Sequence, residues 1–146
     1  MDTVLTALHV VAAVFLVGPM AVLPMTALRA VRAGNAPVVE LLGTSTRVFS
    51  LASVLVAVLG FGVLGVLGKT ENVSVATGWV LTSIVLYAAA LALSLLVVVP
   101  SMRRAAAELA GNRAEGAQAV YGRLAASSGI VALLLVAVTV LMVWRP

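Results

Sequence analysis

Apolar residues occupy this chain in four long runs, and charged residues are confined to the segments between the runs. The runs cover residues 3–28, 48–68, 79–99 and 124–144. Crossing about 30 Å of hydrocarbon takes roughly 20 apolar residues in a helix, so each run can span a bilayer. With their flanking turns, the runs predict helices at about 3–32, 37–68, 79–110 and 114–144. The expected fold is all-α: a four-transmembrane-helix bundle forming a single integral membrane domain over residues 1–146.

Composition supports a membrane protein and excludes several other classes. The chain is 63% hydrophobic and 10% charged, and a soluble domain of 146 residues cannot hide that much apolar surface. It contains no cysteine, which excludes disulfides, thiolate metal sites and covalent haem attachment. The basic residues flank apolar runs, a pattern typical of a topology signal rather than of a nucleic-acid-binding patch. The expected partner is therefore the lipid bilayer, and nucleic acid is not expected.

The basic residues also predict how the chain is oriented. Most of them lie in the connections that follow the first and third runs, and only two lie at the opposite ends of the runs. Basic residues are enriched in cytoplasmic connections, so we expect both of those connections in the cytoplasm and both termini outside. The two groups are Arg29, Arg32, Arg47, Arg103, Arg104, Arg113 and Arg123 on the first side, and Lys69 and Arg145 on the other.

Proline and basic residues occur in the same order in the two halves of the chain. A shift of 76 residues places Pro24 on Pro100, Arg47 on Arg123, and Lys69 on Arg145. Each half is one helical hairpin of the same orientation. This pattern is typical of a tandem two-helix repeat about an axis along the membrane normal.

Small and polar residues predict where helices begin, break and approach one another. Asn35 is a candidate N-cap for the second helix, and the Gly111-Asn112 pair predicts a break before the fourth. Small residues let transmembrane helices pack closely, so glycines predict helix contacts in the second run. These glycines are Gly60, Gly62, Gly65 and Gly68.

His9 is the only histidine and lies inside the first apolar run. Ionisable residues inside membrane helices are costly and usually face the bundle interior, so His9 is the leading candidate for a functional residue. It lies about two turns from the helix start, roughly 9 Å below the interface at 1.5 Å per residue. Tyr87 in the third run is expected at a similar depth, which makes it a further candidate for binding a cofactor there.

Two interpretations of His9 compete. In the structural one, its imidazole hydrogen-bonds to Tyr87, Ser83 or Thr6 and joins two helices. In the functional one, its Nε2 is a metal ligand, to the iron of haem b or to copper. A second histidine ligand is impossible within one chain. Met142 is the only methionine at a suitable depth to complete a haem site.

A resemblance to known proteins supports the second interpretation. The stretch from Leu8-His9 through Gly18-Pro19 to Pro24 resembles the first helix of the copper-resistance-D-like superfamily of bacterial membrane proteins. That superfamily includes the membrane-bound protoporphyrinogen oxidase and several uncharacterised four-helix families, and the chain looks most like one of the latter. The resemblance implies that His9 matches a histidine implicated in haem b binding, and that the protein lies in the bacterial inner membrane. Leu16 and Met25 replace the tryptophan and arginine of the oxidase, which argues against porphyrinogen oxidation.

The function expected from these observations is non-catalytic. No P-loop, GxSxG or HExxH pattern is present, and every acidic residue lies outside the apolar runs. We therefore expect a multi-pass membrane protein that acts as an accessory or structural subunit, or as a homo-oligomer, with no cofactor required. The alternative is a haem b-binding redox protein that uses His9, and a small-solute or metal transporter is the third possibility.

Overall fold

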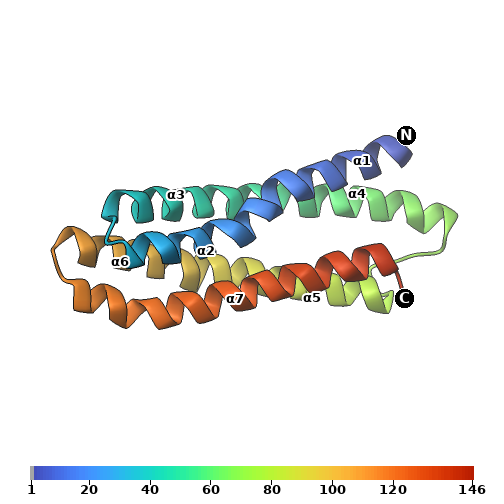
Figure 1. The fold of residues 1–146 in the computed structure, drawn as a ribbon. Helices are drawn as coiled ribbons and strands as arrows, with labels where there is room; N and C mark the ends of the chain where they lie inside the picture. The colour runs from blue at the N-terminus through green and yellow to red at the C-terminus, as the bar shows by residue number, and fades with distance from the viewer. Residues whose placement is uncertain (1) are drawn as a thin grey trace.

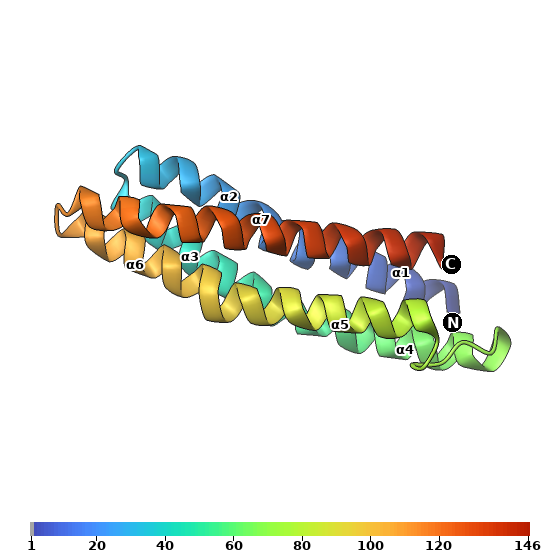
Figure 2. The same ribbon diagram turned by 90° about the horizontal axis from the view of Figure 1, so that it is seen from below.

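Four long apolar helices lie side by side along one direction and make up the whole fold (Figures 1 and 2). The computed structural model describes residues 2–146. Its four long helices cover Thr3–Arg32, Ala36–Thr70, Gly78–Ala110 and Ala114–Trp144, and each is long and apolar enough to cross a membrane. The predicted all-α, four-helix architecture is confirmed.

Three of the four helices are interrupted, and the fourth is continuous. The first consists of α1 (Asp2–Ala12), the π-helical segment η1 (Ala13–Val17) and α2 (Gly18–Arg32). The second consists of α3 (Ala36–Ala52) and α4 (Val54–Thr70), separated at Ser53. The third consists of α5 (Gly78–Leu93), the π-helical segment η2 (Ser94–Val98) and α6 (Val99–Ala110). The fourth is α7 (Ala114–Trp144).

The helix boundaries follow the local sequence. Asn35 caps α3 as predicted, because its side-chain oxygen accepts a hydrogen bond from the backbone N–H of Val38 at 3.3 Å. The predicted break at Gly111-Asn112 is also confirmed, since α6 ends at Ala110 and Asn112 adopts a left-handed φ of 56°. Each hairpin therefore turns within a few residues, which keeps its two helices adjacent.

Each π-helical segment is followed by a proline, with one residue between them. The backbone N–H of Gly18, the residue before Pro19, donates to the carbonyl of Ala13. The backbone N–H of Val99, the residue before Pro100, donates to the carbonyl of Ser94. A proline has no N–H to offer to the preceding turn, and a wider turn accommodates this gap. The equivalent prolines are 81 residues apart, so these landmarks pair Pro100 with Pro19 rather than with Pro24. Pro24 lies inside α2 without interrupting it.

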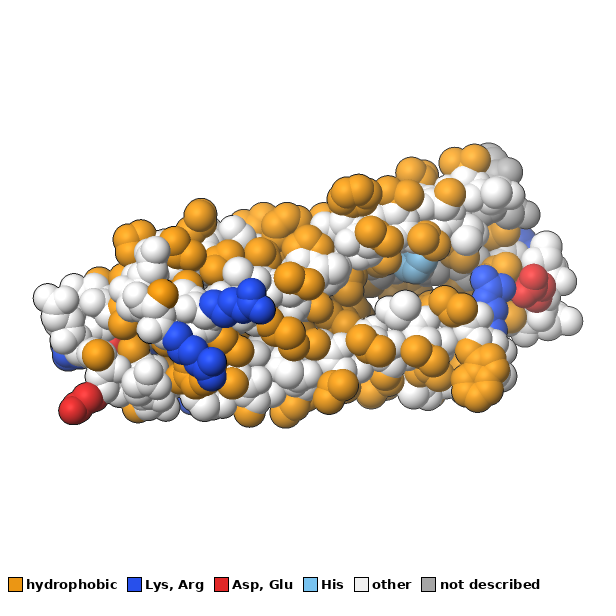
Figure 3. Space-filling model, viewed as in Figure 1, with side chains coloured by type: hydrophobic (Ala, Val, Ile, Leu, Met, Phe, Trp, Pro, Cys, Tyr) orange, Lys and Arg blue, Asp and Glu red, His pale blue; other side chains and the backbone are white. Residues whose placement is uncertain are grey.

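The half of the bundle that holds the two hairpin turns is closely packed. We call it the arginine half, because the seven arginines of the two connections lie there, and several appear in blue in Figure 3. In this half α2 packs on α3 and α7, and α6 packs on α3 and α7, which closes a ring of four helices. Its buried core includes Met20, Ala27, Val31, Val39, Val98, Met102, Ala105, Ala117 and Leu124.

The opposite half, which holds both chain termini, is more open. We call it the terminal half. There α1 packs on α4, and α5 packs on α7, but neither α1 nor α4 packs extensively on α5 or α7 among residues 2–146. Within its described residues, α1 buries no side chain. In Figure 1, α1 diverges from α5 and α7 toward the N-terminus. The helix pairs are thus held together at one end of the bundle and separate at the other.

Candidate functional site around His9

The His9 side chain joins α1 to α4 through a backbone carbonyl. Its Nδ1 lies 2.9 Å from the carbonyl oxygen of Val56, and the ring is half-buried. A carbonyl oxygen can only accept a hydrogen bond, so Nδ1 must carry the proton and donate it. In the neutral imidazole this leaves Nε2 unprotonated, with a lone pair available to a metal or another donor.

Glycines on α4 make room for this contact. A Cβ added at Gly60 would lie 3.4 Å from Nδ1 of His9 and only 2.9 Å from its Cε1, and the second distance is closer than side chains normally approach. One added at Gly62 would lie 3.2 Å from the Leu5 side chain. The predicted role of glycines in close packing therefore applies to these two positions. Gly65, by contrast, has nothing within 4 Å of such a Cβ.

Tyr87 and Ser83, the partners expected for His9 on the third helix, are engaged elsewhere. The Tyr87 hydroxyl hydrogen-bonds to the Ser53 hydroxyl at 2.7 Å. The Ser83 hydroxyl donates to the carbonyl of Trp79 on its own helix at 2.8 Å. The expectation that His9 pairs with either of them is wrong: it bonds to Val56 instead.

The turn around Ser53 nevertheless links His9 and Tyr87 indirectly. The Ser53 hydroxyl donates to the carbonyl of Ser50 at 2.7 Å, and such back-bonding bends helices. The backbone N–H of Val56 then bonds to the Ser53 carbonyl at 2.9 Å. Tyr87 and His9 are therefore attached to the two ends of one turn, Ser53 on one side and Val56 on the other.

Sequence reasoning missed a second buried polar contact beside this turn. The hydroxyls of Ser50 and Ser94 lie 2.9 Å apart, and both side chains are fully buried. This pair joins the second helix to the third at the start of η2. Serines within apolar runs are the signal that could have found it, since hydroxyls commonly hydrogen-bond between transmembrane helices.

The structure does not bring Met142 to His9. Met142 lies near the end of α7 and is partly exposed, and α7 packs on α5, α2 and α6 rather than on α1. Among the side chains of residues 3–146, no three from His, Cys, Asp or Glu gather where they could hold a metal ion. The described site therefore offers one imidazole and no second side-chain ligand packed against it.

The His9 ring faces an open region. Figure 3 shows the one histidine of the chain, in pale blue, at the edge of a hollow between the α1 side and the α7 side of the terminal half. The hollow lies where the two helix pairs separate. A group that entered it would meet an imidazole whose orientation is already set by Val56 and Gly60.

The fold and its long apolar helices define a multi-pass integral membrane protein with four candidate spans. The sequence matches one family model over residues 3–146, described as "Predicted integral membrane protein (DUF2269)". The chain belongs to that family. No match was found among curated proteins or among solved structures. The family description agrees with the expected membrane class but names neither the copper-resistance-D-like superfamily nor an oxidase.

Proposed function

We propose that this protein is a non-catalytic membrane subunit that assembles with a second copy of itself through the open terminal half. The observation that supports this is the separation of the α1–α4 pair from the α5–α7 pair. The positive-inside rule places the arginine half in the cytoplasm, so the assembling half would lie in the opposite leaflet.

The chain carries both parts of such an interface. The terminal half leaves α5 and α7 without extensive contacts to α1 or α4, and α1 is an apolar helix with no buried described side chain of its own. Leu8 and Val11, for example, are 52% and 53% exposed. In a two-fold symmetric dimer, each copy can place its α1 against α5 and α7 of the other, because such interfaces are reciprocal.

Crosslinking in native membranes tests this dimer, and the absence of native cysteines makes each introduced one unique. Leu8→Cys on α1 of one tagged chain should crosslink to Val85→Cys on α5 of a differently tagged chain. Both positions are exposed in the terminal half, at 52% and 58%. We expect a dimer joined between chains, detected by both tags.

The matched control moves the second cysteine to the arginine half. Leu41→Cys on α3 is 65% exposed, yet it should not crosslink to Leu8→Cys. Equal crosslinking of Leu8→Cys to both positions would contradict an interface confined to the terminal half. A chain that remains monomeric in mild detergent and gives no crosslink would contradict self-assembly altogether.

The geometry of His9 favours haem b binding as a second candidate function. Histidine ligands of metals usually donate their other ring N–H to a carbonyl or carboxylate, which fixes the tautomer and the ring orientation. The hydrogen bond from Nδ1 of His9 to the Val56 carbonyl has this form. The residues fit a haem to the extent of one ligand: His9 would hold the iron through Nε2, in the hollow beside α1. The iron would supply electron transfer.

An absorption spectrum of the protein, purified in detergent from cells supplied with haem precursor, tests this second candidate. If His9 binds haem, we expect a Soret band that His9→Ala abolishes. Ser83→Ala is the matched control, because its hydroxyl bonds within its own helix and its loss should leave the band unchanged. A colourless wild-type protein, or a band that survives in His9→Ala, would contradict haem binding at His9.

A further inference from the structure

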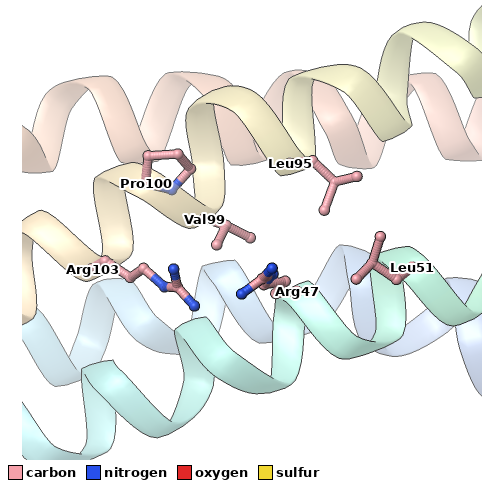
Figure 4. Close-up of a pocket in the computed structure, with 6 residues that line it drawn as sticks. All are labelled: Arg47, Leu51, Leu95, Val99, Pro100 and Arg103. Atoms are coloured by element: carbon pink, nitrogen blue, oxygen red, sulfur yellow. The ribbon is translucent and has the colours of Figure 1, made fainter.

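A cleft of about 380 Å³ opens between the second and third helices in the arginine half. Two arginines and four apolar residues line it, and Figure 4 shows the guanidinium groups of Arg47 and Arg103 side by side in the gap between the helices. The lining residues are Arg47, Leu51, Leu95, Val99, Pro100 and Arg103.

The two arginines carry no neutralising partner from the described part of the chain. Among the described side chains, those of residues 3–146, the ion pairs are Arg113 with Glu108 and Arg145 with Glu71. Arg47 and Arg103 are both exposed and both line the cleft, so two positive charges face the same opening. Guanidinium groups bind phosphate oxygens through bidentate hydrogen bonds. A phosphate between Arg47 and Arg103 would therefore reduce the repulsion between the two positive charges.

The rest of the cleft is apolar and extends toward the membrane interior. Leu51 lies four residues from Arg47, and Leu95, Val99 and Arg103 are also spaced by four. Residues four apart lie on the same face of a helix, so each arginine has an apolar side chain one turn deeper. Residues 48–68 follow Arg47 and form an apolar run of membrane-spanning length, which places Arg47 at the level of the headgroups. A ligand of this cleft should therefore carry an anion at one end and hydrocarbon at the other.

We propose that this cleft binds an anionic phospholipid, with its phosphate between Arg47 and Arg103 and an acyl chain along Leu51 and Leu95. Basic pockets between transmembrane helices are known to take anionic lipid headgroups.

A second cleft, of about 290 Å³, lies across α6 and shares Pro100 with the first. It repeats the same chemistry, with Arg104 and Arg123 beside Val97 and Val120. Anionic lipid thus contacts α6 from both sides.

Native mass spectrometry of the purified full chain, titrated with phosphatidylglycerol, tests the proposal. The wild-type protein should retain phosphatidylglycerol in preference to phosphatidylcholine, which has the same chains but no net charge. Arg47→Gln and Arg103→Gln should each weaken binding about fivefold, the usual contribution of one basic side chain at an anionic membrane surface. Arg29→Gln is the matched control, because Arg29 is exposed and lines neither cleft. It should bind as the wild type does.

Further measurements distinguish binding of a lipid from binding of a free anion, and control for misfolding of the variants. Inorganic phosphate should not displace phosphatidylglycerol at equal concentration, and Leu51→Ala should weaken lipid binding while leaving phosphate binding unchanged. Arg47→Lys keeps the charge, so it should fold even if Arg47→Gln does not, and it should bind lipid more weakly than the wild type. Equal retention of phosphatidylcholine, displacement by inorganic phosphate, or equal affinities in Arg29→Gln, Arg47→Lys and Arg103→Gln would overturn the proposal.

Discussion

Leu124→Ala should destabilise the protein by roughly 2–5 kcal/mol, the usual range for truncating a large buried side chain. Leu124 is fully buried in the arginine half, where α7 meets the core formed by Met20 and Met102. The closed ring of helices around it cannot easily collapse into the space left behind. We expect the loss as a lower free energy of unfolding, measured by titrating the folded protein in mixed micelles with a denaturing detergent.

Leu133→Ala on the same helix is the control for this substitution. Leu133 is 72% exposed and contacts lipid or detergent rather than the core, so its loss should change stability by less than about 0.5 kcal/mol. Similar losses for Leu124→Ala and Leu133→Ala would show that the arginine half is not the packed region that holds the hairpins together.

Gly60→Val should displace the His9 ring and loosen α1 from α4. The added Cβ alone would lie 2.9 Å from Cε1 of His9, so either the imidazole or the helix must move. Overpacking of this kind typically costs about 1–3 kcal/mol. The hydrogen bond from Nδ1 to the Val56 carbonyl would be lost with it. The same detergent titration measures the effect on the free energy of unfolding.

Two comparisons assign the effect of Gly60→Val to the histidine. Gly65→Val makes the same change one to two turns along α4, where nothing lies within 4 Å, so it should be close to neutral. Gly60→Val should also lower the free energy of unfolding by less in a His9→Ala background, because the imidazole ring that clashes with the added side chain is then absent. Equal costs with and without His9 would mean that the two positions are not coupled.

The sequence predicted the four spans because lipid imposes a simple requirement. Every backbone N–H and C=O in the hydrocarbon must be paired internally, so a long apolar run can only be a helix. The cap at Asn35 and the break at Gly111-Asn112 were also predictable, because they depend on local side-chain and backbone preferences.

The packing of the helices was less predictable because the helices are apolar on nearly every side. With 63% hydrophobic residues, no polar face marks which surface meets a neighbour and which meets lipid. The partner of His9 illustrates the difficulty. Polar side chains such as Tyr87 and Ser83 can be read from the sequence, whereas the Val56 carbonyl is a backbone group that every residue possesses. Only the placement of α1 against Gly60 shows which carbonyl is within reach.

The π-helical segment η1 has a consequence for the direction in which His9 points. A π turn holds about one residue more than an α turn, and one residue corresponds to roughly 100° of rotation about the helix axis. Everything on the α1 side of Ala13–Val17 is therefore out of phase with α2 by about a quarter of a turn. In an uninterrupted helix the imidazole would lie roughly 100° around the helix axis from its present position relative to α2. A single extra residue, placed before Gly18-Pro19, thus directs the chain's one histidine to the Val56 carbonyl.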